Sequence, residues 1–157
     1  MTEETARTAG TAVPSVINEM WGALYDRDWD RLRTCFSDDA IYYDVPVGAA
    51  AAARGPADIE SRIRLGFDPL SAIWHHSVTS VASGDVVMTE HIEVWEFPSG
   101  ERVELPFASV QHVRDGRITL WKDYWNQATL MDGAPPWWHD RLAQSDLSWI
   151  FDATGIA

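Results

Sequence analysis

Cysteine is nearly absent from this sequence: the 157 residues include only Cys35. A single thiol excludes an intrachain disulfide and any zinc site built from clustered cysteines. A domain of this length buries about 68–70% of the surface of its unfolded chain, which is enough for stability without a disulfide or a metal. We therefore expect one domain that resides in a reducing cytoplasm.

Long apolar runs and basic residues are also scarce. No apolar run approaches 18 residues, and the polar N-terminus carries Glu3 and Glu4, so we expect neither a membrane span nor a signal peptide. Twelve lysines and arginines stand against 24 aspartates and glutamates, which gives a net charge of −12. This charge repels nucleic acid phosphates and anionic membranes, so no partner of either kind is expected. Solubility alone is a sufficient explanation of the acidity.

Tryptophan, in contrast, is abundant, with nine copies in the chain. Each indole combines a large apolar area with one N–H donor, which suits both a packed core and the wall of an apolar pocket. The composition therefore directs attention to where the tryptophans lie along the predicted elements.

Helical periodicity dominates the first part of the chain. Residues 1–12 are rich in threonine, alanine and glutamate and predict a disordered tail. Apolar residues then recur every three or four positions and predict an amphipathic helix: Val13, Val16, Ile17, Met20, Trp21 and Leu24. A short helical stretch at 28–36 and a strand at 40–45 follow. Residues 46–55 read as a loop, and a third helix begins at Pro56 and ends near Asp68.

From Ala72 onward the apolar period changes from 3.6 to 2. Compact turn signals made of glycine, aspartate, serine and proline separate four strand-like segments, at about 73–82, 86–97, 102–113 and 117–126. This pattern predicts an antiparallel meander. Helices followed by consecutive hairpins predict an α+β fold, with the helices packed on one face of the sheet. Residues 13–132 would form this single domain.

The C-terminal residues 133–157 form a Trp-rich extension in which a short helix is predicted from His139 to Ile150. Trp137 and Trp138 at its start fit a lid over a pocket and a dimer contact equally well. The sequence leaves both interpretations open.

Strand alternation gathers acidic and aromatic side chains on one face of the predicted sheet. The residues that share it are Tyr42 and Asp44, then Thr89, His91, Glu93 and Trp95, and finally Thr119, Trp121, Asp123 and Trp125. Acidic residues at alternate positions most often mark the solvent face of a sheet. Here two indoles flank Asp123, and indoles are poor candidates for open water. We therefore predict a polar cluster inside an apolar pocket.

Three stretches of the sequence resemble the limonene-1,2-epoxide hydrolase family, and the likeness extends over about residues 15–130. They are Thr89–Val94, Val103–Phe107 and Asp115–Trp125, which ends in the most specific piece, WKDYW. That family belongs to the nuclear transport factor 2-like, or SnoaL-like, superfamily of cone-shaped α+β domains. Its members share a curved antiparallel sheet wrapped by N-terminal helices, yet act as epoxide hydrolases, isomerases, dehydratases, polyketide cyclases or binding modules.

The resemblance implies a catalytic set of Tyr42, Asp44, His91, Glu93 and Asp123. In the family, the aspartate at position 123 activates a water with help from a tyrosine at 42 and an asparagine at 44. An aspartate at position 93 protonates the leaving epoxide oxygen, and an arginine at 91 bridges the two carboxylates. One carboxyl must be ionised while the other is protonated, so their environments must separate their pKa values.

This sequence departs from the family at positions 44, 91 and 93. Glu93 keeps an acid but lengthens it by one methylene, and Asp44 places a carboxylate where the family has an amide. His91 replaces a permanent cation with a group that neighbouring carboxylates would draw toward the protonated, bridging state. A neutral His91 could instead act as a base. These departures weaken the prediction of epoxide hydrolysis specifically. They do not weaken the prediction of an acid–base pocket.

The pocket is expected to bind a small hydrophobic substrate such as a terpenoid, steroid or polyketide. The expected wall residues are Trp95, Trp121, Trp125, Thr89 and Phe107. The resemblance implies a homodimer and neither a cofactor nor a metal, although His91 with Glu93 and Asp123 has metal-binding chemistry. Of His75 and His76, alternation allows only one to reach the pocket, and a structural histidine is the commoner case.

The leading hypothesis is therefore a cofactor-independent enzyme that opens epoxides. A second enzymatic hypothesis is a dehydratase, isomerase or cyclase in which His91 shuttles protons with Asp123 or Asp44. A third is a non-catalytic module that binds a hydrophobic ligand or serves as a dimeric scaffold.

Overall fold

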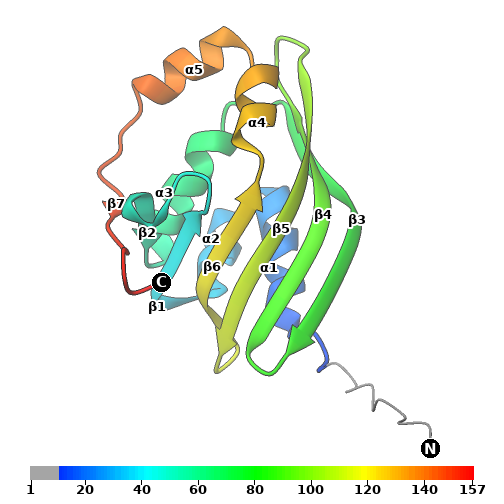
Figure 1. The fold of residues 1–157 in the computed structure, drawn as a ribbon, viewed down its shortest axis with the longest axis vertical. Coiled ribbons are helices and arrows are strands. Elements are labelled where there is room, and N and C mark those ends of the chain that lie inside the picture. The colour runs from blue at the N-terminus through cyan, green and yellow to red at the C-terminus, as the bar shows by residue number, and fades with distance from the viewer. Residues whose placement is uncertain (1–10) are drawn as a thin grey trace, which may run out of the picture.

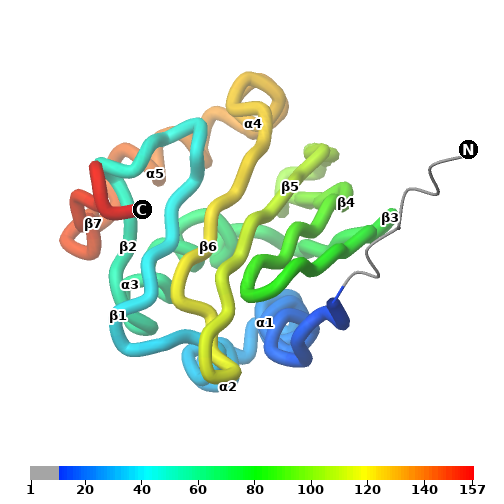
Figure 2. The backbone as a smooth tube through the Cα atoms, turned by 60° about the horizontal axis from the view of Figure 1, so that its bottom comes forward, coloured from blue at the N-terminus to red at the C-terminus, as the bar shows by residue number. Residues whose placement is uncertain are grey.

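Within residues 11–157, seven strands form one strongly curved sheet, and helices pack against its inner side (Figure 1 and Figure 2). The computed structural model describes residues 11–157, so most of the predicted disordered tail, residues 1–12, lies outside the described residues. Thr11 is described, and its N–H donates to the carbonyl of Ala82 at 3.1 Å. None of the helices within 11–157 combines the length and the apolar character needed to cross a membrane.

The strands follow the spatial order β3-β4-β5-β6-β1-β2-β7. Their bounds are β1 (Phe36–Asp44), β2 (Ala52–Arg54), β3 (Ala72–Ser83), β4 (Val86–Glu96), β5 (Arg102–Arg114), β6 (Arg117–Trp125) and β7 (Ile150–Phe151). Neighbouring strands are antiparallel except β1 and β6, which are parallel. The predicted α+β class and the meander of four long strands are confirmed.

The β5–β6 turn illustrates why the meander is readable from the sequence. Asp115 and Gly116 both have positive φ values, 51° and 74°. Two-residue hairpin turns of type I′ require this left-handed backbone at both positions, which glycine adopts freely and aspartate tolerates. The turn fixes the pairing of Arg114 with Arg117 and so the register of both strands.

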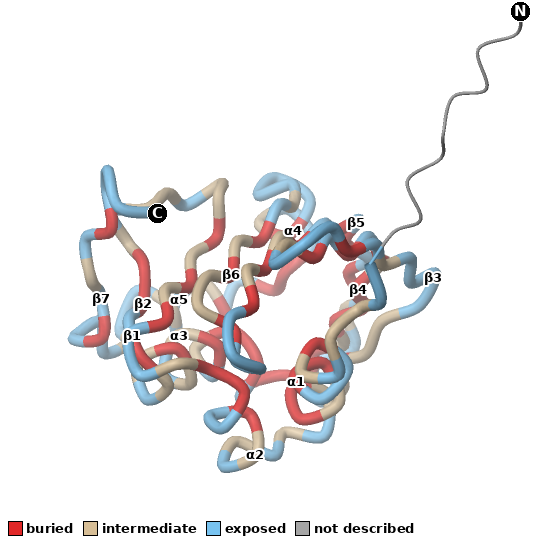
Figure 3. The backbone as a smooth tube through the Cα atoms, turned by 90° about the horizontal axis from the view of Figure 1, so that it is seen from below, coloured by how far each residue is buried: buried red, intermediate tan, exposed pale blue. Residues whose placement is uncertain are grey.

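The helices are α1 (Ser15–Asp26), α2 (Trp29–Thr34), α3 (Pro56–Phe67), α4 (Gln127–Gly133) and α5 (Pro136–Ala143). The apolar stripe of α1 is buried as predicted, at Ile17, Met20, Trp21 and Leu24. Helix α3 buries Ile59, Ile63 and Phe67 at the same kind of spacing. Figure 3 shows the buried backbone concentrated where these helices meet the sheet.

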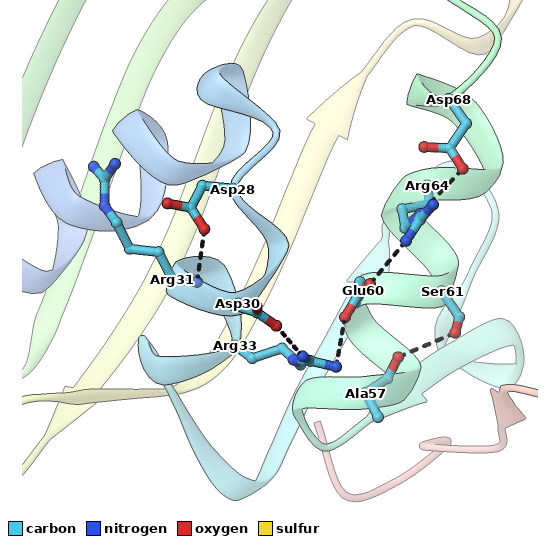
Figure 4. A network of polar contacts seen from close by, with 9 residues as sticks. All are labelled: Asp28, Asp30, Arg31, Arg33, Ala57, Glu60, Ser61, Arg64 and Asp68. Atoms are coloured by element: carbon cyan, nitrogen blue, oxygen red, sulfur yellow. Dashed lines mark hydrogen bonds and ion pairs between the residues drawn. The ribbon is translucent and has the colours of Figure 1, made fainter.

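Ion pairs join the outer sides of α2 and α3 (Figure 4). Arg33 contacts both Asp30 on its own helix and, at 3.1 Å, Glu60 on α3. Glu60 in turn contacts Arg64 at 3.1 Å. Charges on these faces leave the opposite, apolar faces of the two helices to pack toward the sheet.

Several segments differ from the sequence-based expectation: β1 already begins at Phe36, and α4 was not expected. Residues 46–55 are not wholly a loop, because they include a short 3-10 helix, η1 (Ala49–Ala51), and β2, which pairs with β1. The predicted helix from His139 to Ile150 is wrong: α5 ends at Ala143, and the chain returns as β7 to pair with β2. Asp146 accepts the N–H of Ser148 at 2.9 Å, and this local turn competes with continued helix.

Candidate active site

A cavity of about 390 Å³ lies between the inner face of the sheet, α1, α3 and the C-terminal segment. Its walls are mostly apolar and include the rings of Trp21, Trp95, Phe107, Trp121, Trp125 and Trp138. The polar groups that reach it are Tyr42, Asp44, Arg62, Glu93 and Asp123. An apolar hollow with a few converging polar groups is the usual form of a small-molecule site.

Four of the five predicted catalytic residues line this cavity: Tyr42, Asp44, Glu93 and Asp123. The three carboxyls are 2–4% exposed. Sheet register accounts for part of this convergence, because Asp44 on β1 lies beside Asp123 on β6. Alternation along β4 then turns Glu93 inward, as predicted.

Asp123 is held by hydrogen bonds from both neighbouring strands and from its own. Ser109 Oγ donates to Asp123 Oδ1 at 2.6 Å, and Trp121 Nε1 donates to the same oxygen at 2.5 Å. The hydroxyl of Tyr42 lies 3.2 Å from the other oxygen, Oδ2. The carboxyl is therefore fixed in orientation at the floor of the cavity.

Burial raises the pKa of Asp123 well above its ordinary value, and the nearby carboxylate of Asp44 raises it further. Glu93 contributes in the same direction, while the hydrogen bonds from Ser109 and Trp121 act against the shift. A carboxyl with a raised pKa keeps its proton more readily than an ordinary aspartate does, which is the property that a general acid needs.

Asp44 forms a buried ion pair with Arg62 of α3 through Oδ2. Its Oδ1 accepts the indole N–H of Trp125 at 2.8 Å and lies 3.0 Å from the Tyr42 hydroxyl. Burial lowers the pKa of Arg62, but the charges of Asp44, Tyr42 and Asp123 and the hydrogen bond to Asp44 together raise it above its ordinary value. Arg62 is thus a permanent cation inside the site.

Glu93 is also fully partnered. Trp95 Nε1 donates to Oε1 at 2.7 Å, and the hydroxyl of Tyr25 donates to Oε2 at 2.8 Å. Burial and the charge of Glu93 raise the pKa of Tyr25 well above its ordinary value, so this phenol remains a donor. Each Glu93 oxygen therefore has a neutral hydrogen-bond donor.

The predicted bridge by His91 between the carboxylates is not present. The ring is 1% exposed and stacks on Phe107, with ring centroids 5.2 Å apart, and it is not among the groups that line the cavity. Its Nε2 lies 3.9 Å from Glu93 Oε2, and neither ring nitrogen has a hydrogen-bond partner within residues 11–157. The rings of Trp21, His75 and Phe107 surround the imidazole and hold it in place.

Two threonines also lie outside the cavity. Thr89 is buried but does not line it, and its hydroxyl is 2.9 Å from that of Ser80 on β3. Thr119 is the unpaired residue of a β-bulge, because pairing with β5 passes from Leu120 directly to Ile118. The bulge shifts the alternation, so Thr119 does not share the face of Trp121. The other predicted wall residues, Trp95, Trp121, Trp125 and Phe107, do line the cavity.

Three polar residues of the site were not identified from the sequence: Tyr25, Arg62 and Ser109. Each carried a usable signal. Tyr25 lies four residues after Trp21 on the buried stripe of α1, and Ser109 lies two after Phe107 on β5. Arg62 directly precedes the buried Ile63 of α3, which makes it a charge at the edge of an apolar stripe.

No group of three or more potential metal ligands is present among residues 11–157. His75, the other inward histidine candidate, packs against the rings of Tyr25 and His91, with centroids 4.5 and 4.9 Å away. It is not a cavity-lining residue. It belongs to the aromatic cluster behind Glu93.

Comparison with known proteins is consistent with this geometry. The chain is 30% identical over 113 residues to epoxide hydrolase EphG of Mycobacterium tuberculosis, covering 71% of each chain. An epoxide hydrolase structure from M. tuberculosis, of the limonene epoxide hydrolase-like type, superposes with a TM-score of 0.61. It is 26% identical and covers 76% of this chain and 86% of that one.

A suggested polyketide cyclase from Xanthomonas campestris pv. campestris has the same fold, with a TM-score of 0.68 and 21% identity. The match covers 76% of this chain and 93% of that one. The family model for the SnoaL-like domain matches residues 17–121. This chain therefore belongs to the SnoaL-like domain family, whose nuclear transport factor 2-like α+β fold it shares.

Proposed function

We propose that this protein hydrolyses an epoxide of a compact hydrophobic molecule, with Glu93 and Asp123 as the acid–base pair. The observation that carries the proposal is the presence of both carboxyls, each buried and hydrogen-bonded, in one apolar cavity. The 30% identity to an epoxide hydrolase supports the reaction class. No cofactor is required.

Epoxide hydrolysis needs two proton transfers, the formation of one C–O bond to water and the cleavage of one epoxide C–O bond. One carboxylate accepts a proton from water as the water oxygen forms a bond to an epoxide carbon. The other carboxyl gives its proton to the epoxide oxygen as the C–O bond breaks, and a diol is released. A dry cavity favours this division because it separates the pKa values of two otherwise similar groups.

The volume and the apolar lining of the cavity support a compact hydrophobic substrate. A volume of about 390 Å³ is near the lower end of the roughly 300–1,000 Å³ typical of ligand pockets. The C-terminal segment contributes Trp138, Leu142, Leu147, Trp149 and Ile150 to the wall. These residues lie beyond the part of the chain that the family model matches, residues 17–121. A compact terpenoid epoxide fits it best.

The direct test is incubation with limonene 1,2-epoxide in water enriched in oxygen-18, followed by mass analysis of the product. The proposal predicts a diol that carries one solvent oxygen, with the same yield from the control variant Met88→Ala. Met88 is 53% exposed on the outer face of the sheet and does not line the cavity.

The other hypotheses predict different products. An isomerase or cyclase would change the substrate without incorporation of solvent oxygen, and a binding module would return the epoxide unchanged. Position argues against His91 as the proton shuttle of the isomerase hypothesis, because its ring is stacked behind the cavity wall. Failure of a panel of terpene and steroid epoxides to yield any labelled diol would exclude the proposal.

A further inference from the structure

One phenol lies between two carboxyls in this site. The hydroxyl oxygen of Tyr42 is 3.0 Å from Asp44 Oδ1 and 3.2 Å from Asp123 Oδ2. A phenol has a single O–H proton, so it can donate to only one of the two oxygens. The second contact is a hydrogen bond only if that carboxyl carries a proton and donates it to the phenol oxygen.

Of the two carboxyls that contact Tyr42, Asp44 is the ionised one. Arg62 pairs with Oδ2, and the indole of Trp125 donates to Oδ1. Protonating Asp44 would place a neutral acid against a buried guanidinium and leave that charge without its partner. Tyr42 therefore donates its proton to Asp44.

The Asp123 side is arranged for a neutral acid. Oδ1 accepts from both Ser109 and Trp121, as the carbonyl oxygen of a carboxylic acid does. Oδ2 faces the phenol oxygen of Tyr42. We infer that Arg62 and Asp44 orient the Tyr42 hydroxyl so that Asp123 holds the carboxylic proton of the site and donates it to Tyr42.

Glu93 completes the assignment as the ionised partner. Both of its oxygens accept donors, from Trp95 and Tyr25, and neither donor is a cation. Each donor points at an oxygen of the carboxylate, so neither oxygen of Glu93 is placed to donate a proton of its own. Resting on the proposed function, this arrangement makes Asp123 the acid toward the epoxide oxygen and Glu93 the base toward water. It reverses the division that the family resemblance implies.

The surroundings support this location of the proton. The charged and titratable groups that bear on Asp123 are Asp44 and Tyr42 on β1, Glu93 on β4, Arg62 on α3 and Tyr25 on α1. Burial first, and then the charge of Asp44, raises the pKa of Asp123. Arg62 acts through Asp44 and Tyr42 rather than on substrate, which makes it a positioning residue.

The test is infrared difference spectroscopy of the resting protein at pH 7, which needs no substrate. A protonated carboxylic acid has a C=O stretch well separated from carboxylate bands. We expect this band in the wild type and in Glu93→Gln, and its loss in Asp123→Asn. A band that Glu93→Gln removes and Asp123→Asn retains would overturn the inference, as would a wild type without any such band.

The role of Arg62 is tested by titrating the same infrared band and measuring the pH at which it has lost half of its intensity. Removal of the cation in Arg62→Gln should let Asp44 compete for the proton, so the Asp123 band should weaken and a second carboxylic acid band, from Asp44, should appear. That second band should be absent from the double variant Arg62→Gln/Asp44→Asn. Arg62→Lys should restore the wild-type midpoint. An Arg62→Gln spectrum and midpoint identical to the wild type would remove Arg62 from the account. Since these readouts are independent of turnover, they separate this inference from the proposed hydrolysis.

Discussion

Arg62, near the middle of helix α3, forms a buried ion pair with Asp44, the last residue of strand β1. The side chains are 18% and 5% exposed, respectively. The guanidinium also lies 5.7 Å from the ring centroid of Trp149, so the C-terminal segment packs over the pair. The pair links the helix, the sheet and the segment that closes the cavity.

Loss of this ion pair is expected to destabilise the protein. Arg62→Gln leaves the Asp44 carboxylate buried without its cation, and such a change typically costs about 3–5 kcal/mol. Urea unfolding monitored by tryptophan fluorescence measures the loss. Arg64→Gln is the matched control on the same helix: Arg64 is 43% exposed in its pairs with Glu60 and Asp68, and exposed pairs contribute about 0–1 kcal/mol. Equal effects of the two substitutions would contradict the structural role of Arg62.

Acid sensitivity is expected from His75. Burial first, and then the neighbouring His91, lowers the pKa of His75 from 6.5 to about 4. The unfolded chain therefore binds more protons between these values, so stability is fully present above pH 6.5 and falls as the pH decreases toward 4. The free energy of unfolding of His75→Asn should depend less steeply on pH in this range than that of the wild type. Substitution of the exposed His76 by asparagine should keep the wild-type slope, and a steep slope in His75→Asn would refute the assignment.

The C-terminal wall is expected to set substrate size. Trp138 is 2% exposed and packs edge-to-face on Trp95, with ring centroids 5.9 Å apart. Trp138→Ala should cost about 3–5 kcal/mol of stability and enlarge the cavity. The ratio of kcat/KM for a steroid epoxide to that for limonene 1,2-epoxide should rise.

Trp137 provides the control for that experiment. It is 37% exposed, and its indole N–H donates to Ser99 Oγ at 2.7 Å, away from the cavity. Trp137→Ala should leave the substrate ratio unchanged. A ratio that is also unchanged in Trp138→Ala would show that the extension does not define the pocket.

Much of the fold follows from local signals. The meander is readable because turns containing glycine separate strands that alternate over most of their length, and β4 and β5 pair without interruption. The α1 stripe is readable because its apolar period is regular. The same alternation located Tyr42, Asp44, Glu93 and Asp123 on one face. Pairing of Asp44 with Asp123 could not be read, because β1 and β6 are parallel neighbours far apart in the sequence.

The parts that were missed depend on long-range packing. Strands β2 and β7 exist only because each pairs with a distant segment, and neither has a local pattern of its own. The position of the His91 ring depends on the aromatic rings that surround it. Whether the Arg62 side chain points into the cavity depends on how α3 is rotated against the sheet. Thr119 was misplaced because a bulge has no signature in the alternation that it interrupts.

The central claim is that Glu93 and Asp123 act together on a substrate bound in one apolar cavity. The most direct measurement compares kcat for limonene 1,2-epoxide in Glu93→Gln, Asp123→Asn and the outer-face control Met88→Ala, with the affinity for limonene, which lacks the epoxide, measured by tryptophan fluorescence. The account predicts that each carboxyl variant loses about 10²–10⁴-fold in kcat while its affinity for limonene stays close to that of Met88→Ala. Turnover at the wild-type rate in either carboxyl variant would contradict it.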